Sequence, residues 1–414
     1  MTEQEPRKIC VILNEFPVSE EPGFSDQIEL LEKMGNFLHI IVLKNTDHSS
    51  ISRINAEIKS LAFSPVRLFQ GLGTLALMLI ITPVNSVKAL CLMLKILICS
   101  RHPLTVLKNC LQAVLAVNED IIPLEITHIH SEAFTETARV AVFASVFSGL
   151  KVSFTVLPIN LYCRKCRETA VLLARGNFIF TLSAYDRKHL GEDIFKNKLR
   201  KPVIVSLPPG VNLNNFTFNK KMNIPHEPFK LITIGSLKRK KGIHTVLQAL
   251  KLLKDRGMSF TYRIIGEGEE KDNLEALVKT LGLDGSVVFC GNLSRQKTIN
   301  ELRVSDLFVI APEITTDGDR DSIPMAILES MALGVPVVAT RITGMPEVIE
   351  DEETGILVPP SEPEQLAAAC QSLLQEPENR QLIIVKARLF VEGSCDLLIQ
   401  TRRLSDFLQK SGII

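Results

Sequence analysis

The sequence predicts an α/β protein made of two doubly wound, Rossmann-like domains that face each other across a cleft. Short apolar strand signals alternate with helical segments along most of the 414 residues. A Pro- and Asn-rich stretch at residues 207–229 interrupts this series and marks a domain junction. Apolar residues make up 46% of the chain and aromatic residues only 6%, a balance that suits helices layered on sheets.

The first series of elements is expected to form an N-terminal domain, residues 1–206. Its strands are short apolar runs, predicted at residues 8–13, 39–43, 126–130, 152–156 and 178–183. Its helices are predicted over residues 26–35, about 74–117, and 135–147.

The second series is expected to form a C-terminal domain, residues 207–390. Its strands are predicted at residues 229–234, 262–265, 286–289, 307–310 and 335–339. Residues 391–414 are expected to form a C-terminal helix, which either stays with this domain or returns to the N-terminal one. In such folds ligands bind outside the carboxyl ends of the strands.

Charge and cysteine content restrict the class of protein. The formal net charge is +1, so no overall field favours binding to nucleic acid. Nine cysteines are scattered without a paired framework, and the first residues lack the apolar core of a signal peptide. We therefore expect a cytoplasmic protein. Cys163 and Cys166 have no second pair to complete a zinc site.

Residues 68–87 form an uncharged stretch in which Gly, Thr, Pro and Asn interrupt the apolar residues. These interruptions disfavour a transmembrane helix. The sequence favours a buried helix pair in the N-terminal domain, and the alternative is that residues 89–100 lie against the inner leaflet of a membrane.

Residues 315–340 carry the strongest functional signal. Asp321 precedes a predicted helix and Glu329 lies eight positions later inside it, with Pro324 suited to the first turn and Gly334 placed at the end. The rise of a helix separates the two carboxylates by about 8 Å. The free N–H groups of the helix start lie between them and attract phosphate. A nucleotide-sugar, with hydroxyls at both ends and phosphate between, suits this layout.

Four consecutive cations, residues 238–241, follow the predicted strand at residues 229–234. Such a run is usually a solvated face, and this reading is open for Lys238, Arg239 and Lys240. Lys241 differs because Gly242 follows it and opens a helix, so its ammonium can reach the same phosphates as that helix start.

These segments resemble the donor domain of retaining, GT-B-fold glycosyltransferases of family 4, particularly those that build bacterial exopolysaccharides such as colanic acid. The resemblance implies that Glu329 binds the ribose, that Asp321 faces the transferred sugar, and that Lys241 holds the diphosphate; these three are the expected catalytic residues. The family usually has Glu where Asp321 stands, and Arg where Ser236 stands. Arg239 or Lys238 is the expected substitute for that missing arginine. The full set of donor-binding residues that the resemblance implies is Ser236, Arg239, Lys241, Gly266, Cys290, Ser322, Ile323, Pro324, Met325 and Glu329.

The N-terminal half resembles the family less closely. The residues expected on the acceptor side are Gly23, Phe24, His130 and Asn160. Two histidines usually follow the strand predicted at residues 152–156, but Leu157 and Ile159 stand there, and Asn160 replaces an aspartate. Neither Leu nor Ile can bond a hydroxyl or take a proton, so His130 is the best substitute.

The resemblance also implies a reaction without metal or cofactor. Asp317 and Asp319 are spaced like a metal-binding aspartate pair, but they abut Arg320 and lie in a loop whose family version works without metal. The implied donor is a UDP-sugar.

The leading hypothesis is a retaining glycosyltransferase that moves a hexose from a nucleotide-sugar to a saccharide or lipid-linked acceptor in polysaccharide synthesis. A second hypothesis is a non-catalytic nucleotide-sugar-binding protein that has lost its acceptor-side chemistry. The third is an enzyme of the same fold that epimerises a nucleotide-sugar, although no acid and base pair is evident for it.

Overall fold

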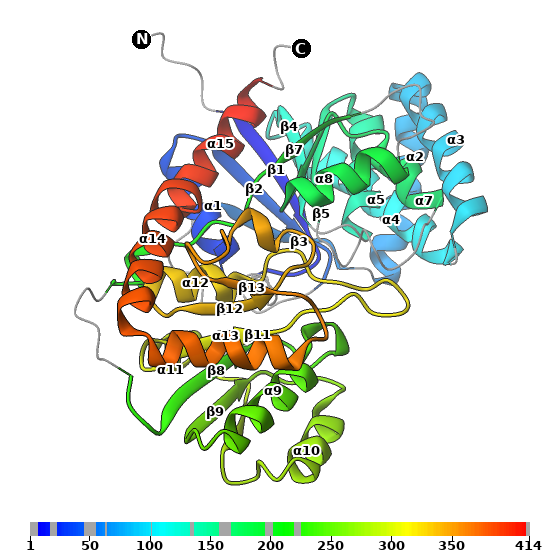
Figure 1. Ribbon diagram of the computed structural model, residues 1–414. Coiled ribbons are helices and arrows are strands. Elements are labelled where there is room, and N and C mark those ends of the chain that lie inside the picture. Colours follow the sequence, from blue (N-terminus) through cyan, green and yellow to red (C-terminus); the bar gives the residue numbers. More distant parts are fainter. Residues whose placement is uncertain are drawn as a thin grey trace. The chain divides into compact units, whose positions relative to one another are not determined.

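The computed structural model describes residues 7–16, 23–44, 55–62, 64–100, 102–132, 136–156, 167–194, 202–218 and 225–410. The chain divides into two compact units. The first contains Met1–Leu182, Asp186–Leu207 and Thr401–Ile414, and the second contains Ser183–Tyr185 and Pro208–Gln400 (Figure 1).

The first unit is built on a seven-stranded parallel sheet in the order β3-β2-β1-β4-β5-β6-β7. The strands are β1 (Lys8–Leu13), β2 (Phe37–Val42), β3 (Glu57–Ser60), β4 (His128–Glu132), β5 (Lys151–Val156), β6 (Phe178–Thr181) and β7 (Val203–Ser206). The strand order reverses after β3, so β1 and β4 are neighbours and the sheet is doubly wound.

The side chains of β1 alternate between two cores, as a strand buried on both faces requires. Ile9, Val11 and Leu13 pack on one face. Cys10 and Ile12 pack on the other. The first core includes residues of α1 (Gly23–Lys33) and α15 (Leu397–Lys410), and the second includes α4 (Pro103–Ala116) and α5 (Glu136–Ser148). This half also contains two shorter helices, α7 (Arg167–Leu173) and α8 (Ala184–His189), and two π-helical turns, Val117–Ile121 and Leu190–Ile194.

The single helical stretch expected at residues 74–117 is wrong, because proline divides it into three helices. They are α2 (Pro65–Ile81), α3 (Pro83–Cys99) and α4, and each begins with a proline, whose missing N–H leaves no bond unmade at that position. The expectation of a buried helix pair is also wrong, since α2 and α3 each expose one face. In the described part of the chain, no helix is both long enough and apolar enough to cross a bilayer.

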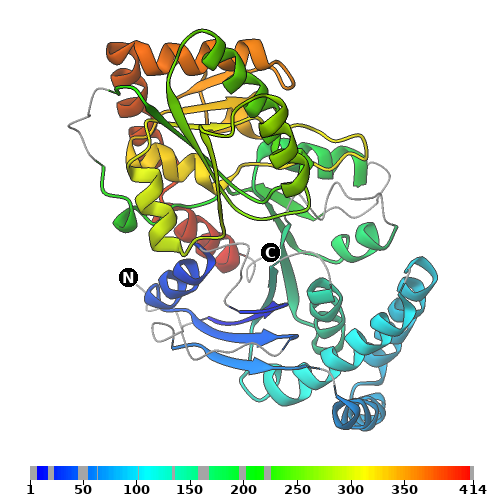
Figure 2. The ribbon, with the colours of Figure 1, turned by 90° about the horizontal axis from the view of Figure 1, so that it is seen from below.

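The second unit, coloured from green to orange in Figure 2, is built on a parallel sheet. This sheet has six strands in the order β10-β9-β8-β11-β12-β13. The strands are β8 (Phe229–Ile234), β9 (Phe260–Ile265), β10 (Val287–Gly291), β11 (Leu307–Ile310), β12 (Val337–Thr340) and β13 (Ile356–Val358). The order reverses between β10 and β11, which places β8 beside β11 at the centre of the sheet.

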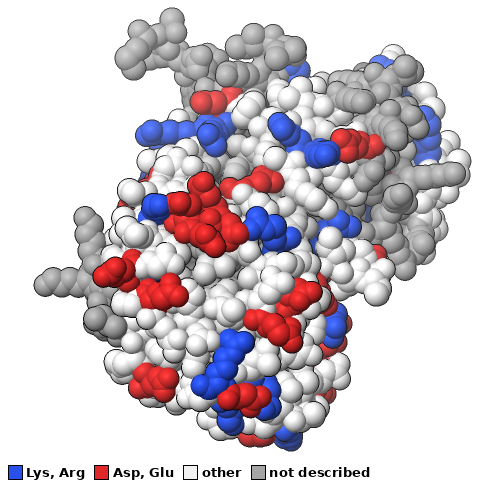
Figure 3. Space-filling model, viewed as in Figure 1, with Lys and Arg blue, Asp and Glu red and all other residues white. Residues whose placement is uncertain are grey.

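Helices cover both faces of this second sheet. One core joins it to α9 (Ile243–Asp255), α10 (Lys271–Thr280) and α13 (Pro363–Gln375). The other joins it to α11 (Arg295–Arg303), α12 (Met325–Leu333) and α14 (Pro377–Ser394). Acidic and basic side chains are both scattered over the visible face of this unit, without one sign covering it (Figure 3).

The predicted strands all form, with ends displaced by at most two residues. Both sheets match the doubly wound class expected from the sequence. The described elements that the sequence did not predict include β3, β7 and β13, which are short and occupy the edges of the sheets. Residues 391–414 do not form one helix of their own, because α14 extends to Ser394 and α15 begins at Leu397.

Candidate functional site

Three tight turns stack at the carboxyl edge of the second sheet. The Gly235 N–H donates to the Ile265 carbonyl at 2.9 Å, and the Gly266 N–H donates to the Gly291 carbonyl at 2.9 Å. A Cβ at Gly266 would lie 2.0 Å from the Gly235 carbonyl oxygen, so only glycine fits there. The backbones after β8 and β9 are thereby in direct contact, and the Lys241 side chain lies against Gly235, where a Cβ would be 3.4 Å from Lys241 Cε. Ser236 follows in this turn and is half-buried.

The loop after β8 is held against the end of β11 by Gly242. This residue has φ of +63°, and a Cβ there would lie 1.6 Å from the Ala311 carbonyl oxygen. It follows the 3₁₀ turn Arg239–Lys241 and precedes α9, so a single left-handed residue joins the turn to the helix. The Glu313 N–H donates to the Lys240 carbonyl at 2.9 Å and adds a second tie between the two loops.

Two lysines and two aspartates form a charge cluster where these loops meet. Lys240 Nζ lies 3.1 Å from Asp319 Oδ1 and 3.3 Å from Asp321 Oδ1. Lys241 forms an ion pair with Asp321. The solvated reading of Lys240 is wrong, because the residue is only 6% exposed. The two carboxylates compensate its buried charge. No feature of the local sequence indicated this pairing.

Asp321 is ionised within this cluster. Burial alone would raise the pKa of its carboxyl, but the charges of Lys241 and Lys240 outweigh burial and place the pKa below its ordinary value. Burial likewise opposes the charge of Lys240, and Asp321 and Asp319 raise its pKa. Both pKa shifts therefore favour the charged forms of Asp321 and Lys240.

The arginine expected to replace the missing family cation is engaged elsewhere. Arg239 Nε lies 2.9 Å from Glu313 Oε1, and more than half of the Arg239 side chain is exposed. His244 Nε2 lies 3.4 Å from the other oxygen of Glu313. Burial lowers the pKa of His244. Lys238 is half-buried.

The helix that carries Glu329, α12, ends at Gly334 as expected but begins one residue later than expected. Pro324 lies just before α12 as its N-cap instead of in its first turn, so Met325 is the first helical residue. Gly334 ends the helix with φ of +82°. A nine-residue helix of this kind presents free N–H groups and a partial positive charge at its start, beside Ser322 and Ile323.

Glu329 is 3% exposed, and its carboxylate is paired. Arg295 Nη2, from α11, lies 2.6 Å from Glu329 Oε1. The Arg295 guanidinium also lies over the ring of Phe216, 5.4 Å from its centroid. Arg295 therefore orients the carboxylate that the sequence assigned to a ribose.

The segment that follows β12 fixes the backbone around Asp321. Thr343 has φ of +45°, and its hydroxyl donates to the Asp321 carbonyl at 2.8 Å. The next residue, Gly344, lies against Ile323, since a Cβ there would be 3.0 Å from Ile323 Cγ1. Cys290 lies farther along the edge at an irregularity of β10, half-buried, and burial raises the pKa of its thiol.

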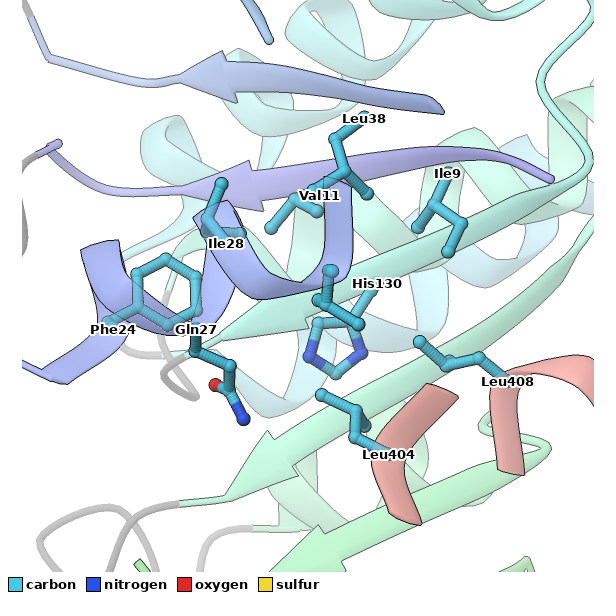
Figure 4. A pocket seen from close by; sticks show the side chains of 10 residues that line it. Ile9, Val11, Phe24, Gln27, Ile28, Leu38, His130, Leu404 and Leu408 are labelled. Carbon is cyan, nitrogen blue, oxygen red and sulfur yellow. The ribbon is translucent and has the colours of Figure 1, made fainter. Parts of the chain in front are cut away.

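In the first unit, Phe24 and His130 meet at one small pocket (Figure 4). Its other lining residues are Ile9, Val11, Gln27, Ile28, Leu31, Leu38, Leu404 and Leu408. It has room for about one water molecule and is lined mainly by apolar side chains. A sugar does not fit there.

His130 is turned into the fold. It is 3% exposed, its Nδ1 lies 2.8 Å from Ser153 Oγ, and its Nε2 lies 3.2 Å from Thr155 Oγ1. Both ring nitrogens therefore have hydroxyl partners within the sheet. Gly23 is the first residue of α1. Asn160, with Leu157 and Ile159, lies outside the described residues.

The sequence missed Lys240, Arg295 and Thr343 as parts of the site. Lys240 was hidden within a run of cations, and Arg295 and Thr343 belong to other elements of the fold than the acids they contact. Over the residues that the structure describes, no group of three or more His, Cys, Asp or Glu side chains could hold a metal ion. Cys163 and Cys166 lie outside those residues.

Residues 214–390 match the family described as "Glycosyl transferases group 1". A "Putative colanic acid biosynthesis glycosyltransferase WcaL" of Escherichia coli is 28% identical over 272 residues, which cover 64% of each chain. The "Amylovoran biosynthesis glycosyltransferase AmsK" of Erwinia amylovora is 30% identical over 274 residues, which cover 59% of this chain and 66% of that protein. The matched region thus spans less than two thirds of these curated relatives.

Solved structures show the same fold over nearly the whole chain. A glycosyltransferase from Rickettsia africae aligns with a TM-score of 0.71 and 19% identity, covering 98% of both chains. HepE of Anabaena, crystallised with UDP and glucose, aligns with a TM-score of 0.69 and 14% identity, covering 98% of this chain and all of that one. The two parallel sheets therefore form a GT-B fold, as the sequence predicted.

Proposed function

We propose that this chain, whose residues 214–390 are a glycosyl transferase group 1 domain, moves a hexose from a nucleotide-sugar to a saccharide or lipid-linked acceptor. We further propose that it is a family 4 enzyme that retains the anomeric configuration and takes part in exopolysaccharide synthesis. The donor is a UDP-sugar in this proposal.

One observation carries the proposal. Asp321 pairs with Lys241 and lies in the chain just before the start of α12. Lys241 follows β8 and Asp321 follows β11, and the strand order of the second sheet reverses at these two neighbouring strands. Ligands of doubly wound sheets bind at that point. A lysine and a helix start together form an anion site suited to a diphosphate.

The buried carboxylate on the same helix suits the other end of a nucleotide. Glu329 is oriented by Arg295 and retains a second oxygen with acceptor capacity for ribose hydroxyls. In this proposal the base binds beside the backbone of Gly266 and Cys290, at the ends of β9 and β10.

In the proposed reaction, the bond between the anomeric carbon and the diphosphate oxygen breaks and its electron pair remains on the diphosphate. The acceptor hydroxyl forms the new bond to the anomeric carbon, and its proton passes to the leaving diphosphate. Lys241 and the backbone N–H groups of Ser322, Ile323 and Met325 stabilise the charge that develops there. Placement and this charge stabilisation supply most of the catalysis.

Metal independence is part of the proposal because lysines supply the positive charge. Asp319, one member of the pair that resembled a metal site, contacts Lys240 instead. We assign no catalytic role to His130, since both of its ring nitrogens contact hydroxyls. The acceptor would be presented at the inner face of a membrane if it is lipid-linked.

The test is calorimetric titration of the full chain with UDP and with GDP, alongside an assay of donor hydrolysis and transfer. Tight binding of UDP with slow release of sugar from a UDP-hexose is the expected result. Binding of either diphosphate without release or transfer of sugar would favour a non-catalytic nucleotide-sugar-binding protein. Full transferase activity in an Asp321→Ala or Glu329→Ala variant would contradict the assigned site.

A further inference from the structure

Helices α2 and α3 form an adjacent pair that packs on α4 and α5 of the first unit (Figures 1 and 2). Their inner faces are well packed. A Cβ at Gly71 would lie 3.0 Å from Leu111 Cβ, which shows how closely α2 approaches α4. Ala89, Leu92 and Ile96 of α3 are buried. The pair is therefore a fixed part of the unit.

The opposite side of the pair is also apolar. We call it the α2–α3 outer face and define it by Val66, Phe69, Ile80, Val84, Leu94 and Ile98. Phe69 is 73% exposed, Ile80 79% and Ile98 86%. A helix at the surface of a globular protein normally turns polar residues outward, and a helix that is apolar all round is normally covered on every side. This face therefore has the composition of a surface that contacts a partner.

The charge of this region identifies the kind of partner. No Asp or Glu occurs between Glu57 and Glu119, whereas the whole chain has 46 of them among 414 residues. The basic residues of α2 and α3 are Arg67, Lys88 and Lys95. Arg67 is held by Glu119 at 2.9 Å, while Lys88 and Lys95 are exposed.

Lys88 and Lys95 lie beside the apolar residues of the outer face. They are seven positions apart on α3, so both project on the same side, next to Val84, Leu94 and Ile98. A second copy of this chain seated symmetrically on the face would bring lysines toward lysines without an acid to pair them. Anionic phosphates satisfy the same lysines.

We propose that the α2–α3 outer face binds the surface of a bilayer that contains anionic phospholipid. The two helices lie along the interface, with their apolar side chains at the boundary of the acyl chains and with Lys88 and Lys95 on headgroup phosphates. Neither helix spans the bilayer. This binding does not require the transfer reaction and is tested without it.

The absence of tryptophan from the chain allows a direct test. Ile98→Trp places a single indole on the outer face, and Leu382→Trp places one at an exposed position of α14 in the second unit. Both full-length variants are mixed with vesicles of equal parts phosphatidylglycerol and phosphatidylcholine. We expect the emission of Ile98→Trp to shift to shorter wavelength and to be quenched by brominated acyl chains, and that of Leu382→Trp to stay unchanged.

Vesicle sedimentation measures the affinity. The Ile80→Glu, Ile98→Glu double variant should lose at least about tenfold in binding to the mixed vesicles, since burying its carboxylates at the interface is unfavourable. The matched control, Leu382→Glu with Leu389→Glu, should bind as the wild type does. Lys88→Gln with Lys95→Gln should abolish the preference for phosphatidylglycerol over pure phosphatidylcholine.

Thermal unfolding followed by circular dichroism serves as the control for folding of each variant, and UDP titration separates this proposal from the proposed function. Absence of vesicle binding by the wild type, or equal binding by the Ile80→Glu, Ile98→Glu variant, would overturn the proposal. A second result would also overturn it: the wild type is a dimer in sedimentation velocity, the double variant is a monomer, and neither binds vesicles. The face would then contact a second copy of the chain. None of these outcomes depends on whether sugar is transferred.

Discussion

Lys241 forms an ion pair with Asp321, and this contact joins the loop after β8 to the loop after β11. Lys240 contacts the same carboxylate, at 3.3 Å. Without a ligand, Asp321 thus balances the two cations that lie nearest to the proposed diphosphate site. An incoming diphosphate would share or replace that carboxylate as the partner of Lys241.

This relationship predicts that a nucleotide compensates for the loss of Asp321. In Asp321→Asn, Lys240 and Lys241 lose a negative partner while both side chains remain largely buried. We expect the unliganded variant to be less stable by about 3 kcal/mol, as when one partner of a buried pair is removed. We also expect UDP to raise its melting temperature more than it raises that of the wild type, because the phosphates replace the missing charge.

Thermal unfolding with and without UDP checks this prediction. Asp317→Asn is the matched control, because Asp317 is in the same loop but is exposed, and it should behave as the wild type. An equal UDP-induced shift in Asp321→Asn and in the wild type would show that Asp321 does not share its cations with the ligand.

Removal of the Lys241 ammonium should weaken binding of every diphosphate. We expect Lys241→Met to lose about 1.5 to 3 kcal/mol of binding free energy for UDP, the range for a hydrogen bond to a charged group. Lys238→Met, in the same cation run, should lose far less. Titration calorimetry at low and high salt measures both. If both variants lost the same binding free energy for UDP, the four cations would attract the diphosphate only by their combined charge, and Lys241 would make no specific contact with it.

The sequence predicted the strands around this site but not the contacts within it. β8 and β11 are apolar runs that are easily recognised, and Gly242 marks the turn between strand and helix. The contact between Lys240 and Asp319 joins residues 79 positions apart. It exists because β8 lies beside β11, and strand order is a property of the whole sheet that no local pattern encodes.

The α2–α3 pair shows a different limit. Its apolar composition predicted helical structure, although not the division into separate helices at proline. A sequence that is apolar on all sides also does not reveal which side packs inward. The structure buries Ala89, Leu92 and Ile96 and exposes Leu94 and Ile98. His130 was expected to contact a ligand because it is a polar residue at the end of a predicted strand. In the structure, both of its ring nitrogens instead contact hydroxyls of the neighbouring strand β5.

Glu329 should matter for ligands that contain ribose and not for the diphosphate alone. We expect Glu329→Gln to weaken the binding of UDP by about 1 to 3 kcal/mol and to leave the binding of inorganic pyrophosphate unchanged. Only the nucleotide has ribose hydroxyls that the carboxylate can bind. Competition of pyrophosphate and of UDP against a fluorescent nucleotide measures both affinities.

Arg295→Met provides the companion variant for this prediction. It leaves the Glu329 carboxylate buried without its cation, so we expect a loss of stability together with weaker UDP binding. If Glu329→Gln weakened pyrophosphate as much as UDP, the carboxylate would act on the phosphate site and the ribose assignment would be wrong.

Gly242 should tolerate no side chain. In Gly242→Ala the new Cβ would lie 1.6 Å from the Ala311 carbonyl oxygen, so the loop after β8 must move away from β11. Gly282→Ala is a matched control, because its φ of +64° is nearly the same but no atom lies within 4 Å of its Cβ. We expect the free energy of unfolding to fall by about 1 kcal/mol in the control, from backbone strain alone, and by several kcal/mol in Gly242→Ala. Urea unfolding measures both, and equal losses would show that the close approach to Ala311 relaxes without cost.

The buried His128 predicts an acid-sensitive first unit. Its Nε2 lies 2.7 Å from Ser153 Oγ, and burial, together with the charges of His130, Arg7 and Lys151, lowers its pKa to about 3. The unfolded chain has a histidine pKa near its ordinary value of 6.5. Between these two values the unfolded state binds a proton that the folded state does not. The free energy of unfolding therefore falls as the pH falls below 6.5, by up to about 1.4 kcal/mol per pH unit.

His128→Gln removes this titration and keeps an amide that can bond Ser153. From pH 7 to pH 5, the wild type should lose about 2 kcal/mol more stability than the variant, and urea unfolding at the two pH values measures the difference. The same substitution at the exposed His226 should leave the pH dependence of the wild type in place. If His128→Gln and the wild type lost the same stability over this interval, His128 would take up its proton without unfolding the first unit. The pair of hydrogen bonds that Ser153 makes with His128 and His130 would then accommodate a charge inside the sheet.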